Sequence, residues 1–269
     1  MRPSRMLAIG VTAPAFGLAA AITATAAPAQ AAPAVHYVAL GDSYSSGVGA
    51  GGTSGACNQS PNAYPALWAK AHSPASFTFA ACSNATTSDV IGNQLSSLNS
   101  STTLVSITIG GNDAGFSSIM ETCVLKSTNS CESVVTAAEK FVAGTLPGRL
   151  DTTLADIRSR APQAKVVVVG YPDFYDLSAW LCIGLSRADH QALDTGINDL
   201  DGALQAAAAR NGDAFADARP QFSAHELCSG SDWLNAITLP ISSSYHPNAA
   251  GQQNGYLPVF AAAAAKTGQ

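Results

Sequence analysis

The chain has 269 residues, of which 47% are hydrophobic and only 12% are charged, and its formal net charge is −5. The sequence contains no basic stripe, which argues against nucleic acid as a partner and against strong electrostatic attraction to anionic membranes. The length suits a single α/β domain with a sizeable buried core.

The first 31 residues have the pattern of a secretory signal peptide. Arg2 and Arg5 give a positive start, Met6–Ala27 carries no charge, and residues 29–31 (Ala-Gln-Ala) match a signal-peptidase site. We therefore expect cleavage after this site, or up to three residues later, and one secreted domain over residues 32–269. An uncleaved anchor is the alternative. No later stretch is apolar for long enough to span a bilayer, so we expect no stable membrane anchor.

Strand-like and helix-like segments alternate along the rest of the chain. The runs expected to form strands are Val35–Leu40, Phe77–Ala81, Leu104–Ile109, Lys165–Gly170 and Ala214–Ala216. The segments expected to form helices are Asn62–Ala71, Ser88–Leu98, Ser133–Arg160, Arg187–Arg210 and Asn248–Ala264. The continuous β-branched run Val166–Val169 is typical of a strand buried on both faces. The alternation predicts an α/β fold with a parallel sheet of about five strands.

Local signals refine the helix boundaries. Ser88 is a candidate N-cap, and Pro147 and Gly148 should break or kink the long helical segment around them. We expect Thr122–Ser133 and Asp176–Arg187, which carry cysteines, to be loop insertions.

The six cysteines all follow the signal segment, and in an exported chain an even number indicates three disulfides. Six cysteines allow fifteen pairings, and the sequence alone does not choose among them. Sequential pairing closes local loops and is the arrangement that we favour: Cys57–Cys82, Cys123–Cys131 and Cys182–Cys228. Metal binding is the competing interpretation, but the chain has no CxxC motif and no Cys with a His at ligand spacing, so we expect no metal.

Three polar residues stand at apparent element boundaries. Ser43 follows the first strand in Gly-Asp-Ser, Asn112 follows the third strand in Gly-Gly-Asn-Asp, and His246 precedes Pro247 near the C-terminus. Each also has a simpler explanation as a turn or cap residue. Because the carboxyl ends of parallel strands share one edge of a sheet, these segments can converge there. A hydroxyl nucleophile, an amide donor and an imidazole base together indicate an acyl-transfer site.

A glycine-rich segment just after Ser43 offers a different interpretation. Residues 47–52 match G-x-G-x-x-G, the dinucleotide-binding pattern. The glycines do not follow the strand directly, and no acidic residue lies about twenty positions later, where it would bind the ribose. We therefore expect no nucleotide cofactor and interpret this segment as a mobile loop beside the site.

These segments have the order and content of the SGNH (GDSL-type) hydrolases, and the chain resembles the secreted bacterial lipases and phospholipases of that family. Gly41-Asp42-Ser43 matches the first block, with Tyr44 where Leu is usual, and Gly110–Asp113 matches the third. His246-Pro247 matches the last block, although Ser243 occupies the position of its usual Asp. Asn84 stands where the second block usually has Gly.

The resemblance implies a three-layer α/β/α, flavodoxin-like fold and hydrolysis of carboxylic esters without a cofactor. Ser43 would be the nucleophile and His246 the base, while the N–H of Ser43, the N–H of Asn84 and the side chain of Asn112 would form the oxyanion hole. Because Ser243 has no carboxylate, we expect a Ser–His dyad whose imidazole is oriented by the main-chain carbonyl of Ser243.

The expected substrates are lipid esters, namely acylglycerols and glycerophospholipids, and we expect a monomer. Apolar residues near the predicted site suit an acyl chain, although ordinary core packing also explains them: Phe116, Ile119, Met120, Tyr175, Leu177, Trp180 and Leu181. A carbohydrate esterase that deacetylates sugars remains an alternative, as does a secreted binding protein with a degenerate site.

Overall fold

The computed structural model describes residues 8–10 and 34–266. The predicted signal segment and its cleavage site therefore lie almost wholly outside the described residues. The domain begins at Ala34 and is described as far as Lys266. Within the described residues, no helix is both long and apolar enough to cross a bilayer.

A five-stranded parallel sheet forms the centre of the domain, which confirms the predicted fold class. Its strands are β1 (His36–Gly41), β2 (Ser76–Phe79), β3 (Leu104–Thr108), β4 (Lys165–Val169) and β5 (Ala214–Ala216). They lie side by side in the order β2-β1-β3-β4-β5, and every pair is parallel. The central strands β3 and β4 are buried almost throughout because helices cover both faces of the sheet.

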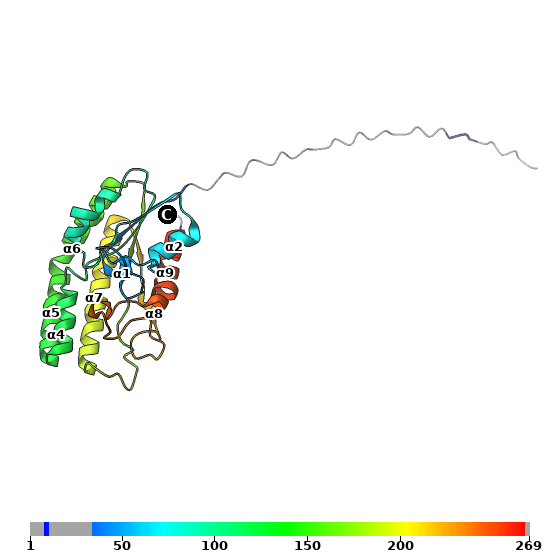
Figure 1. Cartoon of the computed structure of the whole chain (residues 1–269). Helices are drawn as coiled ribbons and strands as arrows, with labels where there is room; N and C mark the ends of the chain where they lie inside the picture. Colours follow the sequence, from blue (N-terminus) through cyan, green and yellow to red (C-terminus); the bar gives the residue numbers. More distant parts are fainter. Residues whose placement is uncertain (1–7, 11–33, 267–269) are drawn as a thin grey trace, which may run out of the picture. The chain divides into compact units, whose positions relative to one another are not determined.

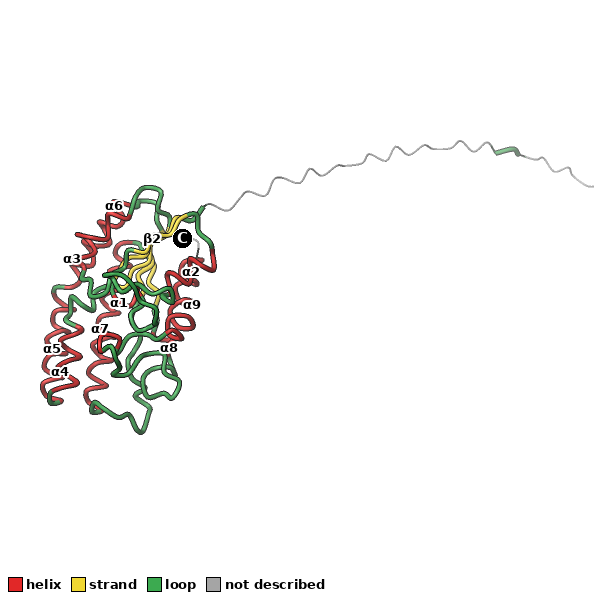
Figure 2. Tube along the Cα trace, in the orientation of Figure 1, coloured by secondary structure: helices red, strands yellow, loops and turns green. Residues whose placement is uncertain are grey.

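Helices flank the sheet on both sides (Figure 1). The α-helices are α1 (Ser43–Ser46), α2 (Tyr64–His72), α3 (Thr87–Asp89), α4 (Phe116–Leu125), α5 (Thr128–Gly144), α6 (Leu146–Arg160), α7 (Arg187–Asn211), α8 (Arg219–Phe222) and α9 (Leu257–Ala265). Helix α7 packs on β4 and β5 and is covered in turn by α5 and α6, whereas α9 packs on the same two strands from the other face. Figure 2 shows the sheet between these two helical layers.

Two helix boundaries differ from the predictions. The segment Thr122–Ser133 is not a loop insertion, because α4 extends to Leu125 and α5 begins at Thr128. Ser127 starts the second helix by accepting a hydrogen bond from the N–H of Ser130, as an N-cap serine does. The long helical segment predicted over Ser133–Arg160 breaks at Thr145, between α5 and α6. Pro147 therefore lies in the first turn of α6, where a missing N–H costs no hydrogen bond.

The N-cap of α3 is Thr86 and not Ser88. The Thr86 hydroxyl accepts from the N–H of Asp89, and the Asp89 carboxylate accepts from the N–H of Thr86, which is a reciprocal capping box. This helix is only three residues long and continues as a π-helix over Val90–Gln94 and a 3₁₀ turn over Leu95–Ser97.

The cysteines are paired as Cys57–Cys82, Cys123–Cys131 and Cys182–Cys228, which are the sequential pairs that the sequence favoured. The first bridge ties the segment after the glycine-rich loop to the segment that carries Asn84. The second joins α4 to the start of α5. The third joins the predicted loop insertion before α7 to the segment after α8.

Candidate active site

Ser43 is the first residue of α1 and lies two residues after the end of β1. The strand turns sharply into the helix at Gly41, whose φ of +121° places a hypothetical Cβ 2.4 Å from the carbonyl oxygen of Thr108. Only glycine therefore fits at this position. Asp42 is the N-cap, and its Oδ1 accepts the N–H of Tyr44 at 3.0 Å. This turn fixes Ser43 at the carboxyl edge of the sheet.

The ring of His246 reaches Ser43 from the other end of the chain. Its Nε2 lies 2.7 Å from Ser43 Oγ, and both side chains are buried. Its Nδ1 lies 2.9 Å from the carbonyl oxygen of Ser244. With Nδ1 protonated, this hydrogen bond leaves Nε2 free to accept the serine proton.

The prediction that Ser243 supplies the orienting carbonyl is wrong, because the adjacent residue supplies it. Ser243 ends a 3₁₀ turn, and its carbonyl accepts the main-chain N–H of His246 at 3.4 Å. Ser244 is extended, with φ −63° and ψ 142°, and Tyr245 then adopts the left-handed φ of +61°. This reversal at Tyr245 turns the Ser244 carbonyl back toward the imidazole.

Two residues whose role was not evident from the sequence hold this reversal in place. The hydroxyl of Tyr44 donates to the carbonyl of Tyr245 at 2.6 Å. Asn235 exchanges main-chain hydrogen bonds with the same turn, accepting from the N–H of Tyr245 at 2.7 Å and donating to the carbonyl of His246 at 2.9 Å. The Asn235 amide also donates to the carbonyl of Gly49, so the glycine-rich loop packs against the His246 turn. Nothing in the local sequence around Asn235 points to this role.

Burial lowers the pKa of His246 from 6.5 to about 4, and the hydrogen bond to the Ser244 carbonyl opposes this change in part. The imidazole is therefore neutral at neutral pH and can accept a proton. Two acidic residues that precede His246 in the sequence make their contacts elsewhere. Asp217 pairs with Arg219 at 2.8 Å, and Asp232 accepts from the N–H groups of the turn that begins at Cys228.

Three residues with free N–H donors line the cavity that Ser43 enters. Within the part of the chain that the structure describes, neither the N–H of Ser43 nor that of Asn84 has a protein acceptor. Asn112 donates one amide hydrogen from Nδ2 to the carbonyl of Ala85 at 3.0 Å and has a second one free. Asn84 has a φ of +64°, which asparagine tolerates better than most residues and which explains how it can replace a glycine here. All three residues line one cavity.

Asp113, which lies shortly after the end of β3, holds the segment that carries Asn84 in place. Its carboxylate accepts the N–H and the hydroxyl of Thr87 at 2.9 and 2.6 Å and pairs with Arg149 at 3.2 Å. Together with the bond from Asn112 to Ala85, these contacts fix two donor segments relative to each other.

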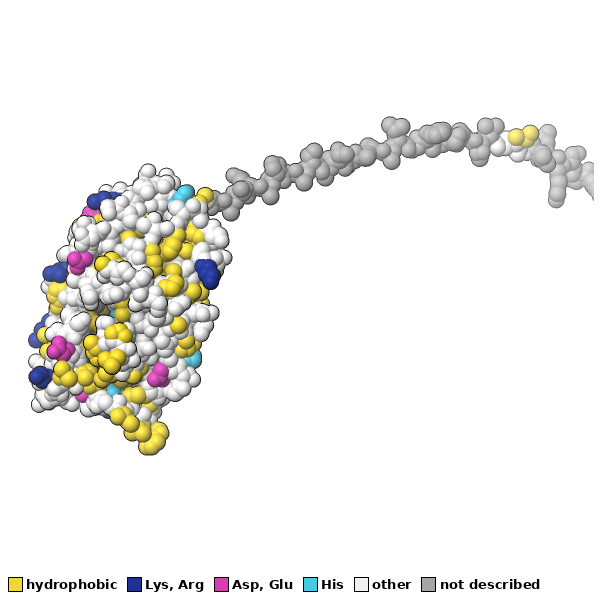
Figure 3. Space-filling view, in the orientation of Figure 1, with side chains coloured by type: hydrophobic (Ala, Val, Ile, Leu, Met, Phe, Trp, Pro, Cys, Tyr) yellow, Lys and Arg dark blue, Asp and Glu magenta, His cyan; other side chains and the backbone are white. Residues whose placement is uncertain are grey.

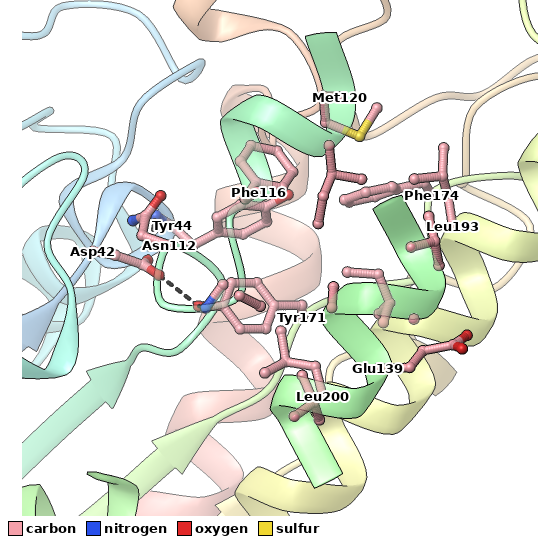
Figure 4. A pocket seen from close by; sticks show the side chains of 18 of the residues that line it. Asp42, Tyr44, Asn112, Phe116, Met120, Glu139, Tyr171, Phe174, Leu193 and Leu200 are labelled. Atoms are coloured by element: carbon pink, nitrogen blue, oxygen red, sulfur yellow. Dashed lines mark hydrogen bonds between the residues drawn. The ribbon is translucent and has the colours of Figure 1, made fainter. Parts of the chain in front are cut away.

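A buried Asp–Tyr pair joins the turn of Ser43 to the segment of Asn112 (Figure 4). The hydroxyl of Tyr171, which follows β4, donates to Asp42 Oδ2 at 2.5 Å and accepts the N–H of Gly111 at 3.2 Å. Burial raises the pKa of Asp42 to about 7, although the Tyr171 hydrogen bond lowers it in part. Tyr171 could not be recognised as a site residue from the sequence, since a tyrosine after a buried strand carries no distinctive motif.

The cavity beside Ser43 has a volume of about 510 Å³. Apart from the polar site residues, apolar side chains from α4 and from the loop before His246 line it: Phe116, Met120, Val124, Leu125, Ile237, Ile241 and Tyr245. A smaller hollow of about 60 Å³ lies behind Phe116 and Met120, between α4, α5 and α7 (Figure 4). Such an apolar cavity suits the acyl part of an ester.

The apolar residues expected near the site divide into three groups. Phe116 and Met120 line both hollows, and Ile119 lines the inner one. Trp180 and Leu181 line neither and are exposed on the loop before α7. Tyr175 is buried against the ring of His190, and Leu177 packs at the edge of the core.

Comparisons with known proteins agree with this geometry. The profile of the GDSL-like lipase/acylhydrolase family matches residues 39–253. The chain is 54% identical over 254 residues to Lipase 1 of Streptomyces coelicolor, covering 93% of this chain and 94% of that protein. It is 48% identical over 266 residues to a lipase of Streptomyces rimosus, covering 97% and 98% of the two chains.

Two solved structures share the fold. A phospholipase A1 from Streptomyces albidoflavus superposes with a TM-score of 0.84 at 52% identity, covering 86% of this chain and 100% of that one. An extracellular lipase from Streptomyces rimosus superposes with the same TM-score at 49% identity and with the same coverage.

Proposed function

Because the chain belongs to the GDSL-like lipase/acylhydrolase family, we propose that it is a secreted serine esterase that hydrolyses carboxylic esters of lipids. One observation carries the proposal: Ser43 Oγ lies 2.7 Å from a buried, neutral imidazole whose other nitrogen is held by a carbonyl, beside an apolar cavity. The relatives named lipase and phospholipase A1 support acylglycerols and glycerophospholipids as the substrate class.

In the proposed mechanism, Ser43 Oγ attacks the ester carbonyl while His246 Nε2 takes its proton. The carbonyl oxygen of Ser244 accepts the Nδ1–H and keeps the ring in the productive tautomer. The N–H groups of Ser43 and Asn84 and the free amide hydrogen of Asn112 stabilise the negative oxygen of the tetrahedral intermediate. His246 then protonates the leaving alkoxide, and a water molecule hydrolyses the acyl-enzyme by the same steps.

Secretion is part of this proposal. Three disulfides stabilise the domain, as is typical of exported proteins, and one similar structure is that of an extracellular lipase. We propose that residues 1–31 are the cleaved signal peptide, so that the mature N-terminus lies between Ala32 and Val35. Mass analysis of the exported protein tests this assignment, and retention of Met1 on the exported chain would disprove it.

The enzymatic proposal is tested by labelling and by a substrate panel. A lipid-like phosphonate should label the wild-type protein at Ser43 and leave Ser43→Ala unlabelled. The wild type should hydrolyse triacylglycerol or phosphatidylcholine and short soluble esters, whereas Ser43→Ala should not. Hydrolysis of acetylated xylan with no activity on lipids would identify a carbohydrate esterase instead. An unlabelled, inactive wild type would indicate a binding protein.

A further inference from the structure

Two loops at the carboxyl edge of the sheet expose large apolar side chains to water. The loop of residues 177–186 presents Trp180 and Ile183, which are 93% and 88% exposed. The loop of residues 236–242 presents Leu239, which is 89% exposed. Isolated exposed apolar residues are ordinary, but such a concentration on two loops usually marks an interaction surface.

The fold holds the first of these loops, called the Trp180 loop below, at both of its ends. The main-chain N–H of Asp176 donates to the carbonyl of Leu227, and Arg187 donates to the carbonyl of Leu177 at 2.6 Å. The Cys182–Cys228 bridge ties the middle of the loop to the segment after α8. These constraints keep the apolar side chains outside the core. Figure 3 shows apolar side chains at the lower end of this view, where the loop before α7 lies in Figure 1.

The second loop is continuous with the catalytic cavity. Ile237 and Ile241 line that cavity together with Ser43 and His246, yet both are more than half exposed. The apolar lining therefore extends from the reacting atoms onto the outer surface around Leu239. Both exposed loops follow carboxyl ends of strands, after β4 and after β5, which is the edge that also carries Ser43.

The charge of these loops indicates what kind of surface they fit. Residues 177–186 and 233–245 contain no Asp, Glu, Lys or Arg, and the whole chain has a net charge of −5. An anionic surface is disfavoured because these residues offer no cation to pair with it, and Arg187, which flanks the first loop, is matched by Asp176 at the other end. An uncharged surface with an apolar interior fits, since a loop tip carrying Trp can place its ring at the boundary between headgroups and hydrocarbon.

We propose that the Trp180 loop, together with residues 236–242, docks the protein on the surface of an uncharged lipid aggregate, such as a phosphatidylcholine bilayer. This inference rests on the proposed function, because docking would bring water-insoluble esters to the mouth of the cavity. The Trp180 loop itself lines neither hollow near Ser43, so its contribution is to surface binding and not to the bond-breaking step.

Vesicle binding by the catalytically silent Ser43→Ala chain tests the proposal without lipid breakdown. Co-sedimentation with phosphatidylcholine vesicles should detect binding, and the fluorescence of Trp180 should shift to shorter wavelength. Trp180→Ser and Ile183→Ser, each added to Ser43→Ala, should weaken partitioning by about tenfold, and both together by about 100-fold. Trp180→Phe is the matched control and should retain most of the binding.

Activity in the Ser43-containing protein provides a second readout. Trp180→Ser should leave kcat/KM on a soluble short-chain ester unchanged and should lower hydrolysis of phosphatidylcholine vesicles at limiting lipid. If Trp180→Ser and Ile183→Ser together left the vesicle binding of the Ser43→Ala chain unchanged, the proposal would be overturned. Binding only to vesicles that contain phosphatidylglycerol would also overturn it.

Two further outcomes separate this proposal from its alternatives. A dimer seen by size-exclusion chromatography, dissociated by Trp180→Ser and without affinity for vesicles, would show that the loop binds a second copy of the chain and would refute lipid docking. Vesicle binding by a wild-type protein that cleaves no ester would support docking while refuting the proposed function. Ester cleavage without Trp180-dependent vesicle binding would refute docking alone.

Discussion

The acid limit of activity should lie unusually low for a histidine base. His246 must be neutral to accept the proton of Ser43, and burial lowers its pKa from 6.5 to about 4. At about pH 5, roughly 90% of His246 would then be neutral, compared with about 3% for a histidine that titrates at 6.5. We therefore expect kcat/KM on a soluble ester to remain close to its plateau at about pH 5 and to fall by half near pH 4.

The same pKa difference should appear in the pH dependence of stability. Between about pH 6.5 and pH 4 the unfolded chain binds a proton at this histidine and the folded chain does not, so the stability falls as the pH falls through this range. The difference between 6.5 and about 4 corresponds to about 3 kcal/mol in the free energy of unfolding. Denaturant titrations at about pH 7 and pH 4.5 should show a smaller loss in His246→Asn than in the wild type.

The pH–rate experiment needs one matched control, because Asp42 adjoins Ser43 and has a pKa of about 7. The acid limit of Asp42→Asn should stay near pH 4 if His246 sets it, whatever the plateau rate of that variant. Incubation at pH 4 followed by assay at pH 7 separates titration from irreversible unfolding. An acid midpoint near 6.5 in both proteins would refute the assignment of a desolvated imidazole held by a neutral carbonyl.

Three further predictions concern neighbouring residues. Asn112→Ala should lower kcat by about 10²–10³-fold with little change in KM, since the lost donor acts on charge that develops in the transition state; a folded variant with full kcat would disprove the oxyanion role. Ser243→Ala should keep most of the activity on a soluble ester, because the carbonyl of Ser244 orients His246; a loss of about 10⁴-fold, the effect of replacing a triad Asp, would contradict this. Between about pH 4 and 7, Asp42 is ionised in the unfolded wild type but still protonated in the folded protein, because burial raises its pKa to about 7, so the wild type loses stability as the pH rises. Asp42→Asn lacks this group and should therefore become more stable relative to the wild type over this range. A difference in denaturant midpoint between the two proteins that is the same at about pH 4 and pH 7 would argue against this.

Local sequence patterns were sufficient to predict the sheet and the positions of Ser43 and Asn112 at its carboxyl edge. A buried parallel strand requires a short run of β-branched and other apolar residues, and such runs are visible at β1, β3 and β4. Ser43 and Asn112 directly follow two of these runs, so knowing where the strands end also locates the residues at the carboxyl edge.

Contacts between distant segments could not be predicted in this way. The hydrogen bonds from Tyr171 to Asp42 and from Tyr44 to Tyr245 join residues 129 and 201 positions apart. Although Asp42 and Tyr44 belong to a recognisable motif, nothing in the local sequence indicates that Tyr171 and Tyr245 are their partners. Only the packing of the folded chain brings the partners within hydrogen-bonding distance.

The orientation of the His246 ring also could not be predicted from the sequence, although the carbonyl that orients it is only two residues away. The sequence determined that no Asp occupies the usual position, and from this a carbonyl could be inferred to orient the ring. Which carbonyl does so depends on the backbone dihedral angles of Ser244 and Tyr245. The left-handed conformation of Tyr245 is stabilised by Tyr44 and Asn235, which belong to other parts of the chain. The direction of a peptide carbonyl is thus decided by the tertiary structure, because the contacts that stabilise an unfavourable dihedral angle are not local in sequence.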